Sequence, residues 1–283
     1  MLKAPVMLRQ RVITGTLLAA VAIAAIVWLP PRALVAVLAA LTLLACWEWA
    51  DLSALRVRWM RVLYCAASLG AMLGLLDWTR LLDGQPDMQR LRLVFGIAAV
   101  WWGLAWLCIK TFPHSSSWWG AVWVRLAMGW FTLLPAWLAC AFLRLQSNGE
   151  WKVIFVLALV SVADSGAYFS GSQFGRHKLA PTVSPGKSWE GFWGGLAASV
   201  LFALAGWRLL WAPHLSLPAL LLIAATTMSA SVLGDLLESM LKRHRGVKDS
   251  GSILPGHGGV LDRFDSISAA VPVFALGLLL TAT

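Results

Sequence analysis

The sequence contains few charged residues for its length. Asp, Glu, Lys and Arg make up 13% of its 283 positions, whereas a soluble domain carries about 25% of them. Tyrosine is also scarce, with two residues against 18 tryptophans. The shortage of charge excludes an ordinary soluble domain.

Several motifs of known chemistry are missing as well. No CxxC pair occurs among the four scattered cysteines, so neither a zinc site nor a disulfide framework is indicated. The histidines lack HExxH or other ligand spacing, and no GxSxG elbow supports a serine nucleophile. The net charge of +10 does not indicate a nucleic-acid partner, because basic loops in membrane proteins mainly set topology.

Long apolar runs dominate what remains. Hydrophobic residues account for 59% of the chain, and several runs approach or exceed the ~20 residues needed to cross a bilayer. We predict an all-α, polytopic membrane bundle of about nine transmembrane helices. The expected spans are 12–29, 32–50, 60–76, 93–109, 120–143, 151–170, 190–210, 217–237 and 267–283.

Loop charges predict the orientation of these spans. With a cytoplasmic N-terminus, most Lys and Arg residues fall in segments on the inner side, in agreement with the positive-inside rule. Loops 171–189 and 238–266 then face the cytoplasm at a bacterial inner membrane. Residues 1–150 read as a scaffold that could also dimerise, and residues 151–283 read as the catalytic region, because the informative polar residues concentrate there.

Two polar segments of the second region suit anion chemistry. Asp164 comes late in an apolar run, where an ionisable group is costly and by default functional, unless it is simply hydrated at the end of the span. The segment "SPGKSWEG", 184–191, resembles the end of a P-loop, but Pro181 stands where that motif requires glycine. Lys187 and the hydroxyls of Ser184 and Ser188 still suit a polyphosphate, although Ser188 could instead cap the next helix.

A third cluster contains acidic residues from two helix ends. Asp235, Glu238 and Lys242 share a face of one helix by their i, i+3, i+7 spacing, and Asp262 and Asp265 are spaced i, i+3 at the start of the last span. Such carboxylates suit Mg²⁺, which completes its shell with water and phosphate oxygens. The surrounding cations are Lys242, Arg243, Lys248 and Arg263. An alternative is a topogenic loop flanked by acidic helix caps.

The glycine-rich part of this cluster suits phosphate. We expect His257 to donate to a phosphate, and the backbone of Gly258-Gly259 to approach phosphate closely because it lacks Cβ atoms. One long pattern resembles the signature of the phosphatidate cytidylyltransferases. It reads Ser239-x-x-Lys242-Arg243-x4-Lys248-Asp249-x-Gly251-x-x-Leu254-Pro255-x-His257-Gly258-Gly259-x-x-Asp262-Arg263-x-Asp265. "SPGKSWEG" is similar to the family's SPxKTxEG, with Ser188 in place of Thr, and "ADSGAYFSG" and "GRHKL" also look like family segments.

The resemblance implies that CTP and phosphatidic acid react to give CDP-diacylglycerol and pyrophosphate with Mg²⁺, and it leaves a second cation and a homodimer open. By position, Asp235 and Asp262 correspond to the acidic metal ligands of the family. The candidate catalytic residues are Asp235, Asp262, Asp265, Lys248 and Asp249. The candidate metal ligands are Asp235, Asp262, Asp265 and Asp164. The candidate substrate-binding residues are Ser184, Lys187, Ser188, Glu190, Lys242, Arg243, His257, Gly258, Gly259 and Arg263.

Other functions remain open at this stage. Intramembrane acids also suit a transporter of anionic solutes. A related synthase of CDP-linked prenyl lipids or a polyprenol kinase would use similar loop chemistry, because the lipid tail contacts featureless apolar spans.

Overall fold

The computed structural model describes residues 4–206, 215–251 and 258–281, with side chains described from residue 15 onward. The helices are α1 (Ala4–Trp28), α2 (Pro31–Leu52), α3 (Arg58–Thr79), α4 (Met88–Lys110), α5 (Ser116–Trp119), α6 (Val122–Leu145), α7 (Gly149–Phe174), α8 (Trp189–Gly206), α9 (Leu217–Arg245) and α10 (Leu261–Thr281). Two short strands, β1 (Lys178–Ala180) and β2 (Ser184–Ser188), form the sheet found in the described residues. The prediction of an all-α bundle is confirmed.

Each of the nine expected spans overlaps a helix among the described residues, although the bounds differ by a few residues. Among the described residues, seven helices are long and apolar enough to cross a membrane: α2, α3, α4, α6, α7, α9 and α10. In α1 the apolar stretch Gly15–Trp28 is shorter, and α8, which starts with Trp189 and Glu190, does not qualify. Seven of the nine predicted transmembrane helices are thus confirmed by length and composition. The protein has the architecture of a polytopic integral membrane protein.

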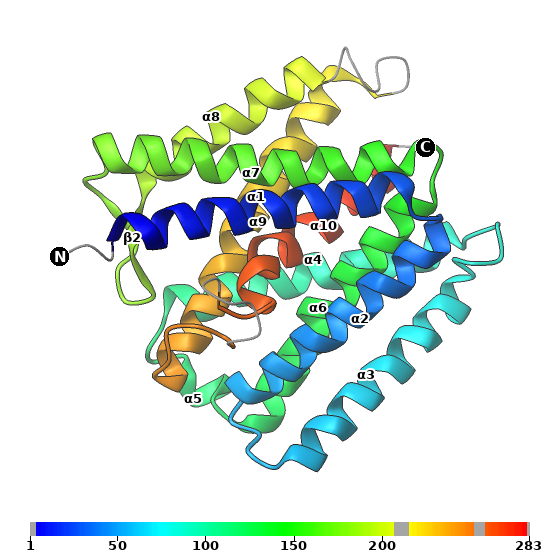
Figure 1. The fold of residues 1–283 in the computed structure, drawn as a ribbon, viewed down its shortest axis with the longest axis horizontal. Helices are drawn as coiled ribbons and strands as arrows, with labels where there is room; N and C mark the ends of the chain where they lie inside the picture. The colour runs from blue at the N-terminus through cyan, green and yellow to red at the C-terminus, as the bar shows by residue number, and fades with distance from the viewer. Residues whose placement is uncertain (1–3, 207–214, 252–257, 282–283) are drawn as a thin grey trace.

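The polar turns gather at one end of the bundle. The connecting segments that meet there are 53–57, 111–121 with α5, 175–188 with β1 and β2, and 246–251, and we call this region the loop end. Arg245 Nε donates to the carbonyl of Asp51 at 3.5 Å, and Thr182 Oγ1 donates to the carbonyl of Phe112 at 3.3 Å. Figure 1 shows the chain termini at opposite ends of the molecule, with α9 running down to the corner that holds α5.

Two buried apolar clusters hold the helices together. One contains Phe95, Phe142 and Phe274, and the other contains Trp49 and Leu237 and lies nearer the loop end. Both clusters combine helices from before and after residue 150. The N-terminal helices therefore form part of the packing that supports the C-terminal ones.

Glycines allow two helix pairs to pack at backbone distance. A Cβ atom at Gly194 of α8 would overlap Ser170 of α7, and one at Gly234 of α9 would overlap the carbonyl oxygen of Asp265 in α10. Small residues permit this close approach between helices in membranes. The second contact places Asp235, the next residue along α9, directly beside the start of α10.

Candidate active site

Three side chains of α9 form a polar stripe that reaches the loop end. Asp235, Glu238 and Lys242 follow one face of the helix, as their spacing predicted. Lys242 Nζ lies 3.0 Å from Glu238 Oε1, and Ser239 Oγ donates to Asp235 Oδ1 at 3.2 Å. The stripe presents two carboxylates and one ammonium group near the start of α10.

Asp262, the second residue of α10, joins this stripe to the loop that follows α9. Its Oδ1 accepts a hydrogen bond from Lys242 Nζ at 2.7 Å. Its Oδ2 accepts from Ser250 N at 3.0 Å, Ser250 Oγ at 2.9 Å and Gly259 N at 2.8 Å. A carboxylate in the first turn is also favoured by the helix dipole. Both oxygens of Asp262 are therefore engaged by groups that converge from three segments.

Residues 178–188 form a β-hairpin that the sequence did not predict. The paired residues are Lys178 with Ser188 and Ala180 with Ser184. Val183 in the turn is completely buried, and Arg243 Nε of α9 donates to its carbonyl at 3.3 Å. The hairpin is thereby anchored against the C-terminal half of α9.

The hairpin delivers Lys187 to the polar stripe. Lys187 Nζ lies 2.6 Å from Asp235 Oδ2, and both side chains remain partly exposed. Asp164 of α7 interacts electrostatically with both members of this pair. Two predicted site residues from β2 and α9, Lys187 and Asp235, are thus brought into contact although they are distant in the sequence.

The remaining carboxylates approach the same place from α9 and α10. The charge of Asp265 interacts with those of Asp235 and Glu238. Glu238 is buried, and its Oε2 has no hydrogen-bond partner. A buried carboxylate oxygen without a partner is costly, so a bound cation or a hydrogen-bond donor would stabilise it.

A ready-made metal cage is not formed by these groups. Among the side chains that the structure describes, no three His, Cys, Asp or Glu residues are grouped so that they could hold a metal ion. The donor set nevertheless fits a hard divalent cation, because it consists of carboxylate oxygens, one of them unpartnered. Shared binding of an ion by Asp235, Asp262 and Asp265 therefore stays a prediction.

Ser188 and Glu190 make local contacts at the start of α8. Ser188 is buried, and its Oγ accepts a hydrogen bond from Gly191 N at 3.1 Å, which is the capping arrangement considered above. Glu190 accepts from the backbone N–H groups of Arg176 and His177, and lies 2.7 Å from His177 Nδ1. These bonds, led by that from the His177 side chain, lower the pKa of Glu190 to about 2. Both residues therefore organise the hairpin and the helix start.

The other predicted residues surround the stripe. Lys248 and Asp249 are exposed on the turn after α9, and Arg243 and Arg263 are exposed at the ends of α9 and α10. Gly258 has φ = +80°, and a Cβ atom there would lie 2.7 Å from Asp262 Oδ2, so this position requires glycine. His257 lies outside the described residues.

The sequence analysis missed Glu48 of α2. Its side chain is buried at the loop end and contacts the segment that leads into α10. The signal was available in "ACWEWAD", because an ionisable residue within an apolar run is by default functional, the argument used above for Asp164.

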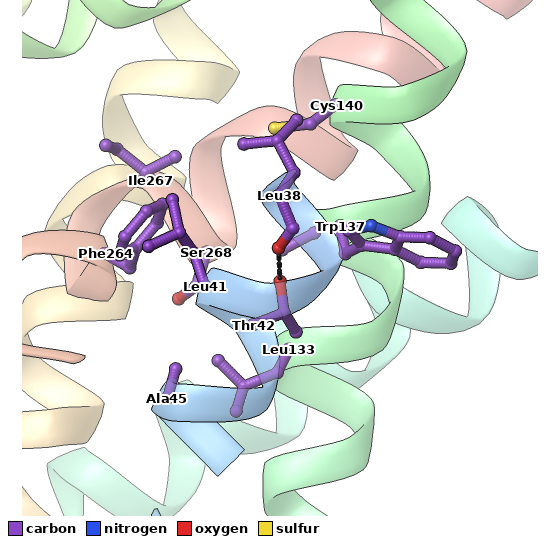
Figure 2. Close-up of a pocket in the computed structure, with 11 residues that line it drawn as sticks. Leu38, Leu41, Thr42, Ala45, Leu133, Trp137, Cys140, Phe264, Ile267 and Ser268 are labelled. Atoms are coloured by element: carbon purple, nitrogen blue, oxygen red, sulfur yellow. Dashed lines mark hydrogen bonds between the residues drawn. The ribbon is translucent and has the colours of Figure 1, made fainter. Parts of the chain in front are cut away.

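An apolar pocket lies next to this polar site. It is formed by α2, α6 and α10, and Phe264, Ile267 and Ser268 line it from the first turns of α10 (Figure 2). The hydroxyl of Thr42 in its wall already donates to the carbonyl of Leu38 at 2.8 Å. The lining contains no charged side chain and therefore offers no ionic partner to a phosphate group.

Comparisons with known proteins cover nearly the whole chain. The sequence model of the cytidylyltransferase family matches residues 9–281. The chain is 44% identical over 269 residues to a phosphatidate cytidylyltransferase of Pseudomonas aeruginosa, with 95% of this chain and 96% of the relative covered. It is 39% identical over 289 residues to a protein of the same name from Haemophilus influenzae, with 95% and 98% covered. A Staphylococcus epidermidis relative of that name is 44% identical over 140 residues, which is 50% of this chain and 54% of the relative.

Proposed function

The chain belongs to the cytidylyltransferase family, and we propose from this premise that it transfers the cytidylyl group of CTP to phosphatidic acid, giving CDP-diacylglycerol and pyrophosphate. The observation that carries the proposal is the convergence of Lys187–Asp235 and Lys242–Asp262 at one end of a membrane bundle. Alternating cationic and anionic groups of this kind suit a site that exchanges phosphates and balances their charge.

The reaction needs little covalent help from the protein. An oxygen of the lipid phosphate attacks the α-phosphorus of CTP, the bond from that phosphorus to the bridging oxygen breaks, and pyrophosphate leaves with the electron pair. Because the lipid phosphate is already ionised, no general base and no enzyme-bound intermediate are required. Catalysis then rests on positioning and on charge stabilisation, as in other phosphoryl transfers.

Lys187 and Lys242 are suited both to positioning the phosphates and to stabilising their charge. Lys187 and Lys242 each contact a carboxylate in the absence of substrate, and phosphate oxygens would take over part of these contacts. The charges of Arg243, Lys248 and Arg263 add to the attraction at the mouth of the site.

Mg²⁺ is the cofactor that fits the donor chemistry. Asp235, Asp262 and Asp265 would hold it, with Glu238 and Asp164 as further candidate ligands, and the free Oε2 of Glu238 supports a cation in this place. When bound, the ion would offset negative charge on the reacting phosphates.

The location suits two substrates that arrive from different phases. CTP is soluble, whereas the acyl chains of phosphatidic acid stay in the leaflet. We place the loop end at the cytoplasmic face of a bacterial inner membrane, on the basis of its basic residues. A homodimer and the division into a scaffold, 1–150, and a catalytic region, 151–283, remain part of the proposal.

Labelled nucleotide tests the reaction class. Detergent-purified protein is incubated with Mg²⁺, phosphatidic acid and CTP labelled at either the α- or the γ-phosphate. We expect α-label to enter the organic phase with release of pyrophosphate, and γ-label to stay aqueous. In a parallel incubation with a polyprenol in place of phosphatidic acid, transfer of γ-label to the polyprenol would indicate a kinase. No transfer of either label to either lipid would favour a transporter.

A further inference from the structure

Glu48 is a buried carboxylate that binds the backbone at the start of α10. Glu48 is only 3% exposed to solvent. Glu48 Oε1 accepts from Val260 N at 3.0 Å, and Glu48 Oε2 accepts from Leu261 N at 2.7 Å. Because the first N–H groups of a helix have no partner within it, this carboxylate satisfies two donors and complements the helix dipole.

The surrounding chain is shaped to admit this carboxylate. A Cβ atom at Gly251 would overlap Glu48 Oε1, and one at Gly259 would lie 2.5 Å from Glu48 Oε2. Neither glycine has the positive φ that would by itself require glycine. The absence of a Cβ atom at Gly251 is therefore explained by the space that Glu48 occupies, and at Gly259 by the space that Glu48 and Ser250 Oγ occupy together.

Ser250 connects Glu48 to the proposed reaction centre. Its Oγ lies 3.4 Å from Glu48 Oε2 and 2.9 Å from Asp262 Oδ2. Its N–H group also donates to Asp262 Oδ2. Since Val260 and Leu261 immediately precede Asp262, Glu48 holds that aspartate both through the backbone of α10 and through Ser250.

The α2 helix provides a rigid base for this contact. Trp49 Nε1 donates to the carbonyl of Arg125 in α6 at 2.7 Å, and Arg125 in turn donates to the carbonyl of Leu52 at 3.3 Å. These buried bonds lock the last turn of α2 against α6. The position of Glu48 is consequently set by the N-terminal helices.

We propose that Glu48 is a positioning residue for the transfer reaction: it fixes the start of α10 and the adjoining residues 258–260, so that Asp262 holds Lys242 where the ammonium group meets the substrate phosphates. The proposal rests on the proposed function. It also gives the N-terminal region, 1–150, a direct part in building the site.

The test compares Glu48→Gln with Asp51→Asn. Both remove one negative charge from the last turns of α2, but Asp51 pairs with Arg61 of α3 and does not contact the α10 segment. In Glu48→Gln one oxygen becomes an NH₂ group that faces backbone N–H donors. The measurements are kcat and KM for CTP, the melting temperature in detergent, and amide hydrogen exchange of residues 258–266.

We expect Glu48→Gln to lower kcat/KM for CTP by roughly 10- to 100-fold, because small misplacements of catalytic groups have effects of this size. Exchange at Val260 and Leu261 should become faster, while Asp51→Asn leaves both readouts unchanged. Gly251→Ala keeps the charge but displaces the carboxylate, and should reproduce the kinetic defect even if Glu48→Gln folds poorly.

Two outcomes would overturn the proposal. One is folded Glu48→Gln with the kcat, KM and exchange rates of Asp51→Asn. The other is a lowered melting temperature with unchanged kcat and KM, which would make Glu48 purely structural. Wild-type protein is assayed in parallel. If the wild type shows no transfer, the proposed function itself is rejected. If the wild type and the variants all show normal transfer, only the role of Glu48 is rejected.

Discussion

Replacing Asp262 by Asn tests the centre of the proposed site. The carboxylate accepts one hydrogen bond from the Lys242 ammonium group at Oδ1 and three from Ser250 and Gly259 at Oδ2. An asparagine has only one acceptor oxygen. In either orientation, its NH₂ group therefore faces a donor, either Lys242 or the Ser250–Gly259 group.

The structure indicates the size of the effect. A hydrogen bond to a charged group contributes about 1.5–3 kcal/mol, and two such contacts, one on each oxygen, are lost or weakened. If the resulting ~3–6 kcal/mol is withdrawn from the transition state, turnover falls by roughly 10²- to 10⁴-fold, because each 1.36 kcal/mol is tenfold in rate. Any part of the loss that falls on folding would reduce this factor and lower the melting temperature instead.

The assay measures transfer of α-labelled CTP into lipid, per folded molecule, for wild type, Asp262→Asn and the control Asp51→Asn. We expect a loss of two orders of magnitude or more for Asp262→Asn and near wild-type turnover for the control. A folded Asp262→Asn protein that retains near-normal turnover would refute the reasoning, because the residue could then neither bind a metal nor orient Lys242.

Three further changes test other parts of the site. Lys187→Ala should raise KM for CTP about tenfold, since a charge-assisted contact to phosphate is lost, and an unchanged response to CTP would limit the hairpin to a structural role. Gly234→Ala should lower the melting temperature and the activity, because its Cβ would overlap the carbonyl of Asp265. The control Gly74→Ala in α3, where a Cβ would meet nothing within 4 Å, should be neutral or stabilising. Equal melting temperatures of the two variants would contradict the close packing of α9 and α10. Treatment with EDTA should abolish transfer and added Mg²⁺ should restore it, and full activity in EDTA would remove the proposed metal.

Local chemistry made much of the molecule predictable. Apolar runs long enough to cross a membrane form helices because only internal hydrogen bonding satisfies the backbone there, and each of the nine expected segments overlaps a helix in the described part of the chain. The spacing of Asp235, Glu238 and Lys242 placed them on one face, since the helix period depends only on neighbouring residues. The pattern from Ser239 to Asp265 was sufficient to indicate the family, which the full-length matches confirm.

Only the tertiary structure decided which charges meet. Lys187 reaches Asp235 because a hairpin with strands of three and five residues, too short for a clear alternating pattern, folds back onto α9. Glu48 contacts Val260 across 212 residues of sequence. Contacts of this kind depend on how helices rotate and pack against one another, which is set by the summed fit of many buried side chains and is not encoded in any short segment.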